Sequence, residues 1–207
     1  EMGIRVLPPD VNESFDGFSV SGRDIRFGLA AVKGVGRSFM KQLVEERETG
    51  GLFSSFQDFC ERMYDRELNR RALESLIKAG SFDSMGYRRS QLLQIVGAVV
   101  DAIAQSRKKN IEGQMDLFGM GNDEVQDTQI ALPDIPEAGK RELLAMEKET
   151  TGLYLSGHPM DEYRELAKKA DAASIRKIID DLSGESTQPA YKDGMTVRLA
   201  CGITSVR

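Results

Sequence analysis

Two glycines, Gly34 and Gly36, stand one residue apart directly before an amphipathic segment. Glycine permits a positive φ and lets the backbone approach a ligand closely. The start of a helix adds unpaired N–H groups and the positive end of the helix dipole, and both attract phosphate. Basic side chains and one hydroxyl group surround this corner. The residues that we expect to hold a phosphate here are Lys33, Gly34, Val35, Gly36, Arg37, Ser38 and Lys41.

The glycine pair alone is a weak signal. It has no third glycine for a dinucleotide fingerprint and no Gly-Lys-Ser/Thr for a P-loop. A second interpretation is a plain corner between two helices, in which the glycines only make the bend. The stretch from Val32 to Val44 resembles the helix-hairpin-helix motif, which binds duplex DNA through its phosphates without reading sequence. Met40 stands where that motif usually has Ala, so we expect altered packing of the two helices.

A second hairpin of this kind is expected from Leu73 to Gly86, followed by a long helix. Two such hairpins would grip two phosphate runs across one groove, and an ordinary helical connection is the alternative. Residues 60–110 carry ten Lys/Arg against six Asp/Glu, whereas residues 111–150 carry three against ten. This change of sign indicates a DNA-facing module followed by a segment that stays off DNA. The expected contacts of the second hairpin are Lys78, Gly80, Ser81, Arg88 and Arg89.

A short peptide in the polar stretch after residue 112 carries two adjacent large apolar side chains, Leu117 and Phe118. Exposed hydrophobic residues in a loop usually fill a pocket, either in a partner or in the chain's own core. The string resembles the sliding-clamp-binding pentapeptide of bacterial replication proteins, Gln-x-Ser/Asp-Leu-Phe. That resemblance implies that Leu117 and Phe118 enter a pocket on the clamp and that the Gln114 amide orients the peptide. The docking peptide comprises Gln114, Met115, Asp116, Leu117 and Phe118, with adaptable Met where Leu is frequent.

Local signals predict a mainly α fold with a small β-hairpin over residues 18–28. Ser54 or Ser55 and Asn69 are candidate N-caps, and Gly80 is a candidate helix stop. Pro136 is a candidate helix start. The alternating residues 195–207 predict a strand, which needs partners. The expected helices cover residues 37–48, about 56–63, 70–79, 88–107 and 137–150, with short ones after Pro159 and Ser174.

The composition, 40% hydrophobic and 29% charged, is ordinary for a globular protein, and the net charge is −5. No apolar run is long enough to span a bilayer. Cys60 and Cys201 lie far apart, which indicates a reducing compartment and argues against a disulfide framework or a metal site. His158, the only histidine, has no nucleophile or ligand partner in sequence, so a turn role is expected. The start at Glu1 and the unfinished strand lead us to expect an excised internal piece.

Four stretches, in this order and spacing, resemble the alpha subunit of bacterial DNA polymerase III, the C-family replicase. They are residues 5–12 (RVLPPDVN), 31–36 (AVKGVG), 68–83 (LNRRALESLIKAGSFD) and 149–159 (ETTGLYLSGHP). The resemblance implies the end of a fingers domain over 1–28, a tandem helix-hairpin-helix module over 29–110 and a clamp-binding loop over 111–136. It implies a helical connector over 137–192 and the first strand of an OB-fold over 193–207.

The same resemblance implies which parts are absent. The palm aspartates that hold two metal ions and the phosphoesterase-like domain lie upstream in this family, so we assign no catalytic residue, cofactor or metal ligand here. Mg²⁺ is expected only in the palm of the full-length protein. The implied partners are duplex DNA, the β sliding clamp and other replicase holoenzyme subunits, in the cytoplasm and without a membrane.

Two other functions remain open. A helix-hairpin-helix repair enzyme such as a glycosylase would use an acid after the hairpin, and Asp58 is the nominal candidate. The chain has no Trp for a base pocket, and its two cysteines cannot ligate an iron–sulfur cluster. The third hypothesis is a non-catalytic interaction module whose hairpins contact protein.

Overall fold

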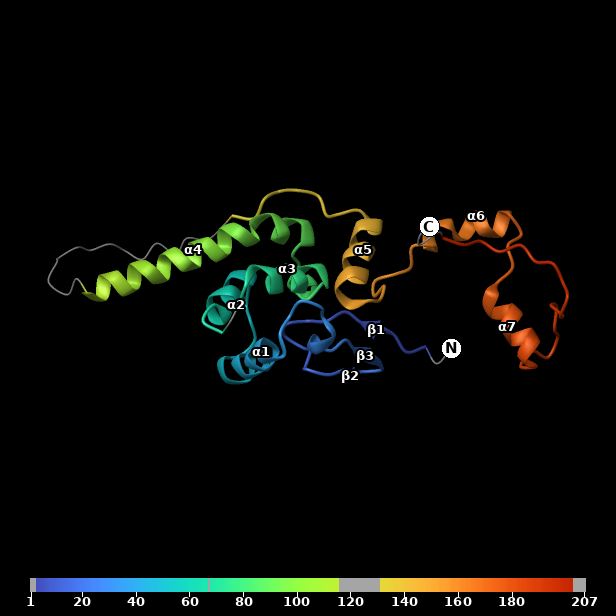
Figure 1. The fold of residues 1–207 in the computed structure, drawn as a ribbon, viewed down its shortest axis with the longest axis horizontal. Helices are drawn as coiled ribbons and strands as arrows, with labels where there is room; N and C mark the ends of the chain where they lie inside the picture. The colour runs from blue at the N-terminus through green and yellow to red at the C-terminus, as the bar shows by residue number, and fades with distance from the viewer. Residues whose placement is uncertain (1–2, 67, 116–130, 203–207) are drawn as a thin grey trace. The chain divides into compact units, whose positions relative to one another are not determined.

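The computed structural model describes residues 3–66, 68–115 and 131–202 (Figure 1). The chain divides into two compact units, Glu1–Ser156 and Gly157–Arg207, each considered by itself below. Helices dominate the described residues, and the strands form a single small sheet near the N-terminus. The prediction of a mainly α fold with a small β element is confirmed.

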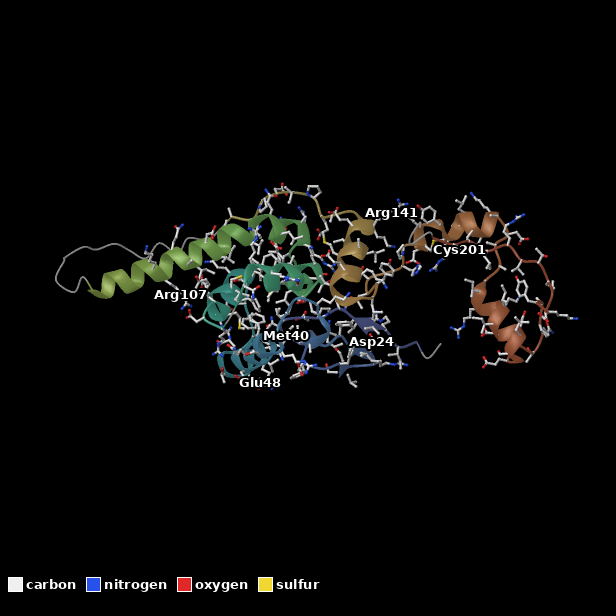
Figure 2. The ribbon with its side chains drawn as sticks, in the orientation of Figure 1. Asp24, Met40, Glu48, Arg107, Arg141 and Cys201 are labelled. Atoms are coloured by element: carbon white, nitrogen blue, oxygen red, sulfur yellow. The ribbon has the colours of Figure 1, made fainter. Side chains whose placement is uncertain are left out.

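The sheet of the first unit has the strand order β1-β3-β2. Strands β2 (Ser19–Ser21) and β3 (Asp24–Arg26) form the predicted antiparallel hairpin. Strand β1 (Val6–Leu7) pairs with β3 in parallel, which the sequence did not indicate. Asp24, labelled in Figure 2, anchors this edge by accepting hydrogen bonds from the backbone N–H of Arg5 at 3.0 Å and from its guanidinium at 2.6 Å.

Helices α1 to α4 follow the sheet, and local caps set several of their limits. Ser55 accepts a hydrogen bond from the N–H of Asp58 and Asn69 accepts one from Ala72, so both predicted N-caps are confirmed. Gly80, at φ +85°, follows the end of α3, as predicted. The elements are η1 (Leu29–Ala31), α1 (Arg37–Gly50), α2 (Phe56–Met63), α3 (Arg70–Lys78), η2 (Asp83–Met85) and α4 (Arg89–Met115).

One hydrophobic core joins the four helices to the loops between them. The rings of Phe53 and Phe82 each meet Phe59 edge to face, with centroids 4.9 and 5.0 Å apart. Met40, labelled in Figure 2, is fully buried in this core, so the side chain larger than Ala fills interior space. Burial of each large side chain stabilises the fold by roughly 1.5–3 kcal/mol. The core therefore holds the glycine corners on a rigid frame.

Helix α4 extends to Met115, beyond the predicted end at Arg107. The Arg107 guanidinium lies over the Tyr64 ring, 5.3 Å from its centroid, and donates to the Glu61 carbonyl at 3.0 Å. These contacts tie this part of α4 to the end of α2. The prediction of loop over residues 111–115 was wrong, because the backbone of α4 continues as helix to Met115.

Helix α5 (Lys140–Thr151) begins after Gly139 instead of at Pro136. The prediction of a helix from Glu137 was wrong by about one turn, since residues 131–139 have no regular secondary structure. Two features account for the later start. Prolines at 133 and 136 favour extended backbone before them. The side chain of Glu137 is also turned toward the start of α4. Leu144 is the fully buried apolar side chain of α5.

The second unit contains η3 (Asp161–Tyr163), α6 (Arg164–Lys169) and α7 (Ile175–Ser183), the short helices predicted after Pro159 and Ser174. Asp181 closes the loop after α7 by accepting from the N–H groups of Ala190 and Tyr191 at 2.8 and 2.9 Å. Residues 195–202 form no strand in the described part of the chain, which corrects the sequence prediction. The Arg198 carbonyl accepts from the N–H of Ala173 at 2.7 Å, but residues 195–202 form no ladder of such bonds, which a strand needs.

Candidate nucleic-acid interface

The first glycine corner uses its two glycines differently. Gly34 has φ +85°, and a Cβ built on it would lie 2.8 Å from Ser75 Oγ, so this position requires glycine for two reasons. Gly36 has φ −73°, with no atom near a built Cβ, and it is the N-cap of α1. A glycine N-cap has no side chain to accept from the first N–H groups of the helix. The start of α1 is therefore uncovered by any cap of its own.

The predicted basic residues stand around this uncovered start. Lys33, Arg37 and Lys41 are exposed. No hydrogen bond or ion pair joins any of the three side chains to another residue that the structure describes. Ser38 is exposed as well, and its hydroxyl accepts from Gln42 at 3.2 Å. Val35 packs against the core between the two glycines.

The corner is braced from α5. The backbone N–H of Lys33 donates to the Thr150 carbonyl at 2.8 Å, at the last turn of that helix. This N–H is therefore already used, although the Lys33 side chain remains exposed. The brace connects residues far apart in sequence, and no local signal could have revealed it.

Arg71 is a residue that sequence reasoning missed. It is exposed on α3, and its Nε lies 3.8 Å from the position of a Cβ built on Gly34. Helix α3 opens the second hairpin, so its approach to the first one depends on tertiary packing. Arg71 thus joins the exposed Lys33, Arg37 and Lys41, which lie beside the same corner in the sequence.

The second glycine corner is built around a buried arginine. Gly80 has φ +85°, and a Cβ there would collide with the Arg89 guanidinium. Arg89 is 4% exposed. It donates to Asp83 at 2.6 Å, to the Lys78 carbonyl at 3.2 Å and to Glu147 at 3.2 Å. Arg89 is thus fixed in the interior, which corrects the expectation that it is a phosphate contact.

The other two cations expected at the second corner are paired within the protein, and the expected serine is buried. Lys78 Nζ lies 3.1 Å from a Glu149 carboxylate oxygen. Arg88 donates to the Ile135 carbonyl at 2.6 Å. Ser81 is fully buried, and its hydroxyl has no hydrogen-bond partner among the described residues. The second corner therefore does not present the exposed phosphate-binding groups that the sequence led us to expect at both hairpins.

A carboxylate already occupies the start of α4. Glu137 accepts from the N–H of Arg89 at 2.8 Å and from that of Ser90 at 3.0 Å. Burial acts to raise the pKa of Glu137, but the N–H groups of Ser90, Ala138 and Arg89 together outweigh it and hold the pKa below its usual value. Residues 133–137, here called the return strap, also accept from Gln91 at 2.8 Å and from the Ser90 hydroxyl at 2.9 Å. An external phosphate would have to displace this strap.

Glu147 fixes the backbone of part of the stretch at residues 152–159 (GLYLSGHP). Its fully buried carboxylate accepts from the N–H groups of Leu155 and Ser156 at 2.8 and 3.0 Å. It also meets Arg89. In the second unit, the His158 ring nitrogen Nδ1 accepts from the N–H of Met160 at 3.1 Å, so this histidine is a turn residue as expected. Both contacts are structural.

The docking peptide falls largely outside the described residues. Gln114 and Met115 form the end of α4, so the prediction that they lie in a loop was wrong. Asp116, Leu117 and Phe118 are not among the residues that the structure describes. The sequence prediction of a clamp contact therefore stays a prediction.

We also searched the described residues for a metal site, a membrane-spanning helix and the acid of a repair enzyme. Within residues 3–66, 68–115 and 131–202, no three His, Cys, Asp or Glu side chains gather as a metal site would require. Over the same ranges, no helix has the length and hydropathy needed to cross a bilayer. Asp58, the nominal acid of a repair enzyme, accepts from the N–H and hydroxyl of Ser54 at 2.8 and 3.1 Å. That carboxylate thus helps to build the start of α2.

Comparison with known proteins agrees with this geometry. The family model described as "Helix-hairpin-helix motif" matches residues 3–92. DNA polymerase III subunit alpha of Saccharopolyspora erythraea is 40% identical over 185 residues, covering 86% of this chain and 15% of that protein. The same subunit of Deinococcus radiodurans is 42% identical over 178 residues, covering 85% and 13%. That of Chlamydia pneumoniae is 36% identical over 220 residues, covering 99% and 18%.

The chain spans less than a fifth of the length of each of these relatives. The matches cover 85 to 99% of this chain, and the helix-hairpin-helix model spans both glycine corners. The resemblance inferred from four sequence stretches is confirmed. The chain belongs to the DNA polymerase III alpha-subunit family, of which it represents one segment.

Proposed function

We propose that this segment holds duplex DNA by its phosphates and docks on a sliding clamp, as part of a replicative DNA polymerase. One observation carries the DNA half of the proposal. The uncapped start of α1 lies at a glycine corner surrounded by exposed basic side chains with no partner among the described residues. Uncapped N–H groups, a positive dipole end and exposed cations form a typical phosphate site.

Contacts of this kind do not read sequence. Phosphate contacts fix position and orientation, and the affinity they give falls as salt rises because counterions are released. A polymerase that advances along its template needs a hold of this type, since a sequence-specific grip would stop it. The net charge of −5 limits general attraction to DNA, so binding is expected to depend on the local cluster.

The clamp half of the proposal rests on the docking peptide. Leu117 and Phe118 would fill an apolar pocket on the clamp, and the Gln114 amide would orient the peptide. Tethering to a ring around DNA makes each return to the primer end intramolecular, at roughly millimolar effective concentration. A weak peptide contact is therefore sufficient.

The chemistry of nucleotidyl transfer belongs, in this proposal, to palm aspartates and Mg²⁺ ions outside this segment. The segment itself supplies position and attachment. Contacts with other holoenzyme subunits, and a cytoplasmic site of action, are proposed for the full-length protein on the names of its relatives.

Fluorescence anisotropy with an end-labelled duplex at several salt concentrations tests the DNA half. The variant Lys33→Ala with Arg37→Ala is expected to bind more weakly, and its log–log salt slope is expected to fall by about two. Lys168→Ala with Lys169→Ala, which removes two exposed charges of the second unit, is the matched control. An unchanged slope would show that the first corner is not the contact surface.

Two further outcomes separate the rival functions. Failure to bind any duplex at low salt would favour a protein-interaction module. Cleavage of a duplex that carries an abasic site or a damaged base would favour a repair enzyme. We expect binding to undamaged duplex and no cleavage.

Binding to an immobilised clamp from the same bacterium tests the docking half. Leu117→Ala with Phe118→Ala is expected to abolish clamp binding and to leave duplex affinity unchanged. Leu132→Ala, an exposed apolar residue of the segment leading into the return strap, is the control. Retention of clamp binding by the double variant would remove the docking proposal.

A further inference from the structure

We infer that Arg71, on the first helix of the second hairpin, completes the phosphate site of the first hairpin. This inference rests on the proposed function, because it names an additional contact for the same duplex. It also changes how the two hairpins cooperate. The second would contribute one side chain to the first instead of forming a second, equivalent grip.

The placement of α3 against Gly34 is the first step. A Cβ built on Gly34 would lie 2.8 Å from Ser75 Oγ and 3.8 Å from Arg71 Nε. Arg71 and Ser75 are four residues apart, so they lie on one face of α3. Because Gly34 has no side chain, that face of α3 borders the backbone of the corner directly. A phosphate at the start of α1 is therefore within reach of a long, exposed arginine on α3.

The availability of the guanidinium is the second step. Five basic residues occupy positions 70–89, and four are engaged: Arg70 with Glu74, Lys78 with Glu149, Arg88 with Ile135 and Asp134, and Arg89 with Asp83 and Glu147. Arg71 is exposed and makes no hydrogen bond or ion pair with another described residue. It is the one cation of this stretch that can bind a ligand without breaking an internal contact.

The state of the second corner is the third step. The Glu137 carboxylate occupies the start of α4, and Arg89 is buried behind it. The usual phosphate position of the second hairpin is thus filled by the protein itself. Among the described residues, the second hairpin can therefore still contact a phosphate through the exposed face of α3.

The chemistry of arginine favours this role. A guanidinium presents parallel N–H groups that match two oxygens of one phosphate, whereas a lysine offers a single point charge. Backbone N–H groups of α1 would hold the phosphate from one side and Arg71 from the other. Such two-sided contact predicts that Arg71→Lys restores only part of the affinity lost in Arg71→Ala.

Arg70 provides a matched control for the experiment. Arg70→Ala removes the same side chain from the adjacent position of the same helix. In anisotropy titrations of an end-labelled duplex, Arg71→Ala is expected to weaken binding roughly tenfold at low salt, with a salt slope smaller by about one. Arg70→Ala is expected to leave affinity and slope unchanged, and Arg71→Lys to lie between the wild type and Arg71→Ala.

The outcomes distinguish this inference from the proposed function. If Arg71→Ala behaves like Arg70→Ala while the Lys33/Arg37 variant weakens binding, the role of Arg71 is wrong and the proposed function stands. If none of these variants alters binding, the proposed function itself fails. A loss of affinity with an unchanged slope would show that Arg71 acts through the fold and would overturn the inference. Arg71→Gln, which keeps a long polar side chain, replaces Arg71→Ala if that variant does not fold.

Discussion

Arg89 Nη2 and Glu147 Oε1 lie 3.2 Å apart in the interior of the first unit, although the two residues are 58 positions apart in the chain. Glu147 is fully buried and Arg89 nearly so. The pair joins the start of α4 to α5, and Glu147 also accepts from the two backbone N–H groups that follow α5. One carboxylate thus holds three parts of the chain together.

Replacing Glu147 by Gln should therefore destabilise the first unit. Breaking one partner of a buried ion pair costs about 3–5 kcal/mol, and the lower end is expected because Arg89 keeps Asp83. Urea unfolding measures the change in the free energy of unfolding. Glu149→Gln, which alters an exposed carboxylate on the same helix, should cost under about 1 kcal/mol. Equal stability of the two variants would contradict the assigned role of Glu147.

The carboxylate of Glu137 should make stability depend on pH. Its pKa in the folded protein lies below its usual value, because the N–H groups it accepts from outweigh the effect of burial. Its stabilisation is thus fully present above the unfolded pKa of about 4.3 and is lost as pH falls through the lower folded pKa. Glu137→Gln is expected to cost about 1 kcal/mol at pH 7.

That difference between wild type and Glu137→Gln should narrow in urea unfolding curves measured at successively lower pH, below about 4.3. Glu142→Gln changes the same charge at an exposed position five residues later and serves as the control. A gap between wild type and Glu137→Gln that stays constant across this range would show that the carboxylate charge is not what caps α4.

The two glycines of the first corner should tolerate alanine unequally. Gly34→Ala meets both a positive φ and the Ser75 hydroxyl, so a loss of about 1–3 kcal/mol is expected. Gly36→Ala meets open space at φ −73°, so its cost should stay below about 1 kcal/mol. Thermal unfolding of the two variants makes the comparison. A larger loss at Gly36 would contradict the geometry of the corner.

The two cysteines should differ in reactivity. Burial raises the pKa of the Cys60 thiol well above its usual value, whereas Cys201 is exposed. A thiol reagent needs the thiolate and access to it, so the folded protein at pH 8 should be labelled once, at Cys201. Denaturant should expose the second thiol. Peptide mapping by mass spectrometry identifies the site, and rapid labelling of Cys60 in native protein would show that the core opens readily.

Elements with local signals were predictable from the sequence. Ser55 and Asn69 cap their helices through bonds to residues three positions ahead, and such pairs are visible in sequence. The turn between β2 and β3 is local as well. The first glycine corner was predictable for the same reason, since its glycines, cations and helix start are contiguous in the sequence.

Features that depend on distant contacts were missed. Arg89 was expected to contact phosphate, because its burial between the nearby Asp83 and the distant Glu147 depends on tertiary packing. Arg71 was not singled out from the sequence, because only tertiary packing brings it to Gly34. The start of α5 was misplaced because Glu137 serves a helix 48 residues earlier. In each case the partner of the residue is set by tertiary packing, which the sequence alone does not show.

The continuity of α4 has a mechanical consequence. The helix begins at the return strap and ends at Met115, inside the proposed docking peptide. At 1.5 Å per residue, the rise from Gln91 to Met115 is about 36 Å. Each helical turn deleted from α4 would shorten this rise by about 5 Å. Under the proposed function, the length of this one helix would set how far a bound clamp stands from the first hairpin.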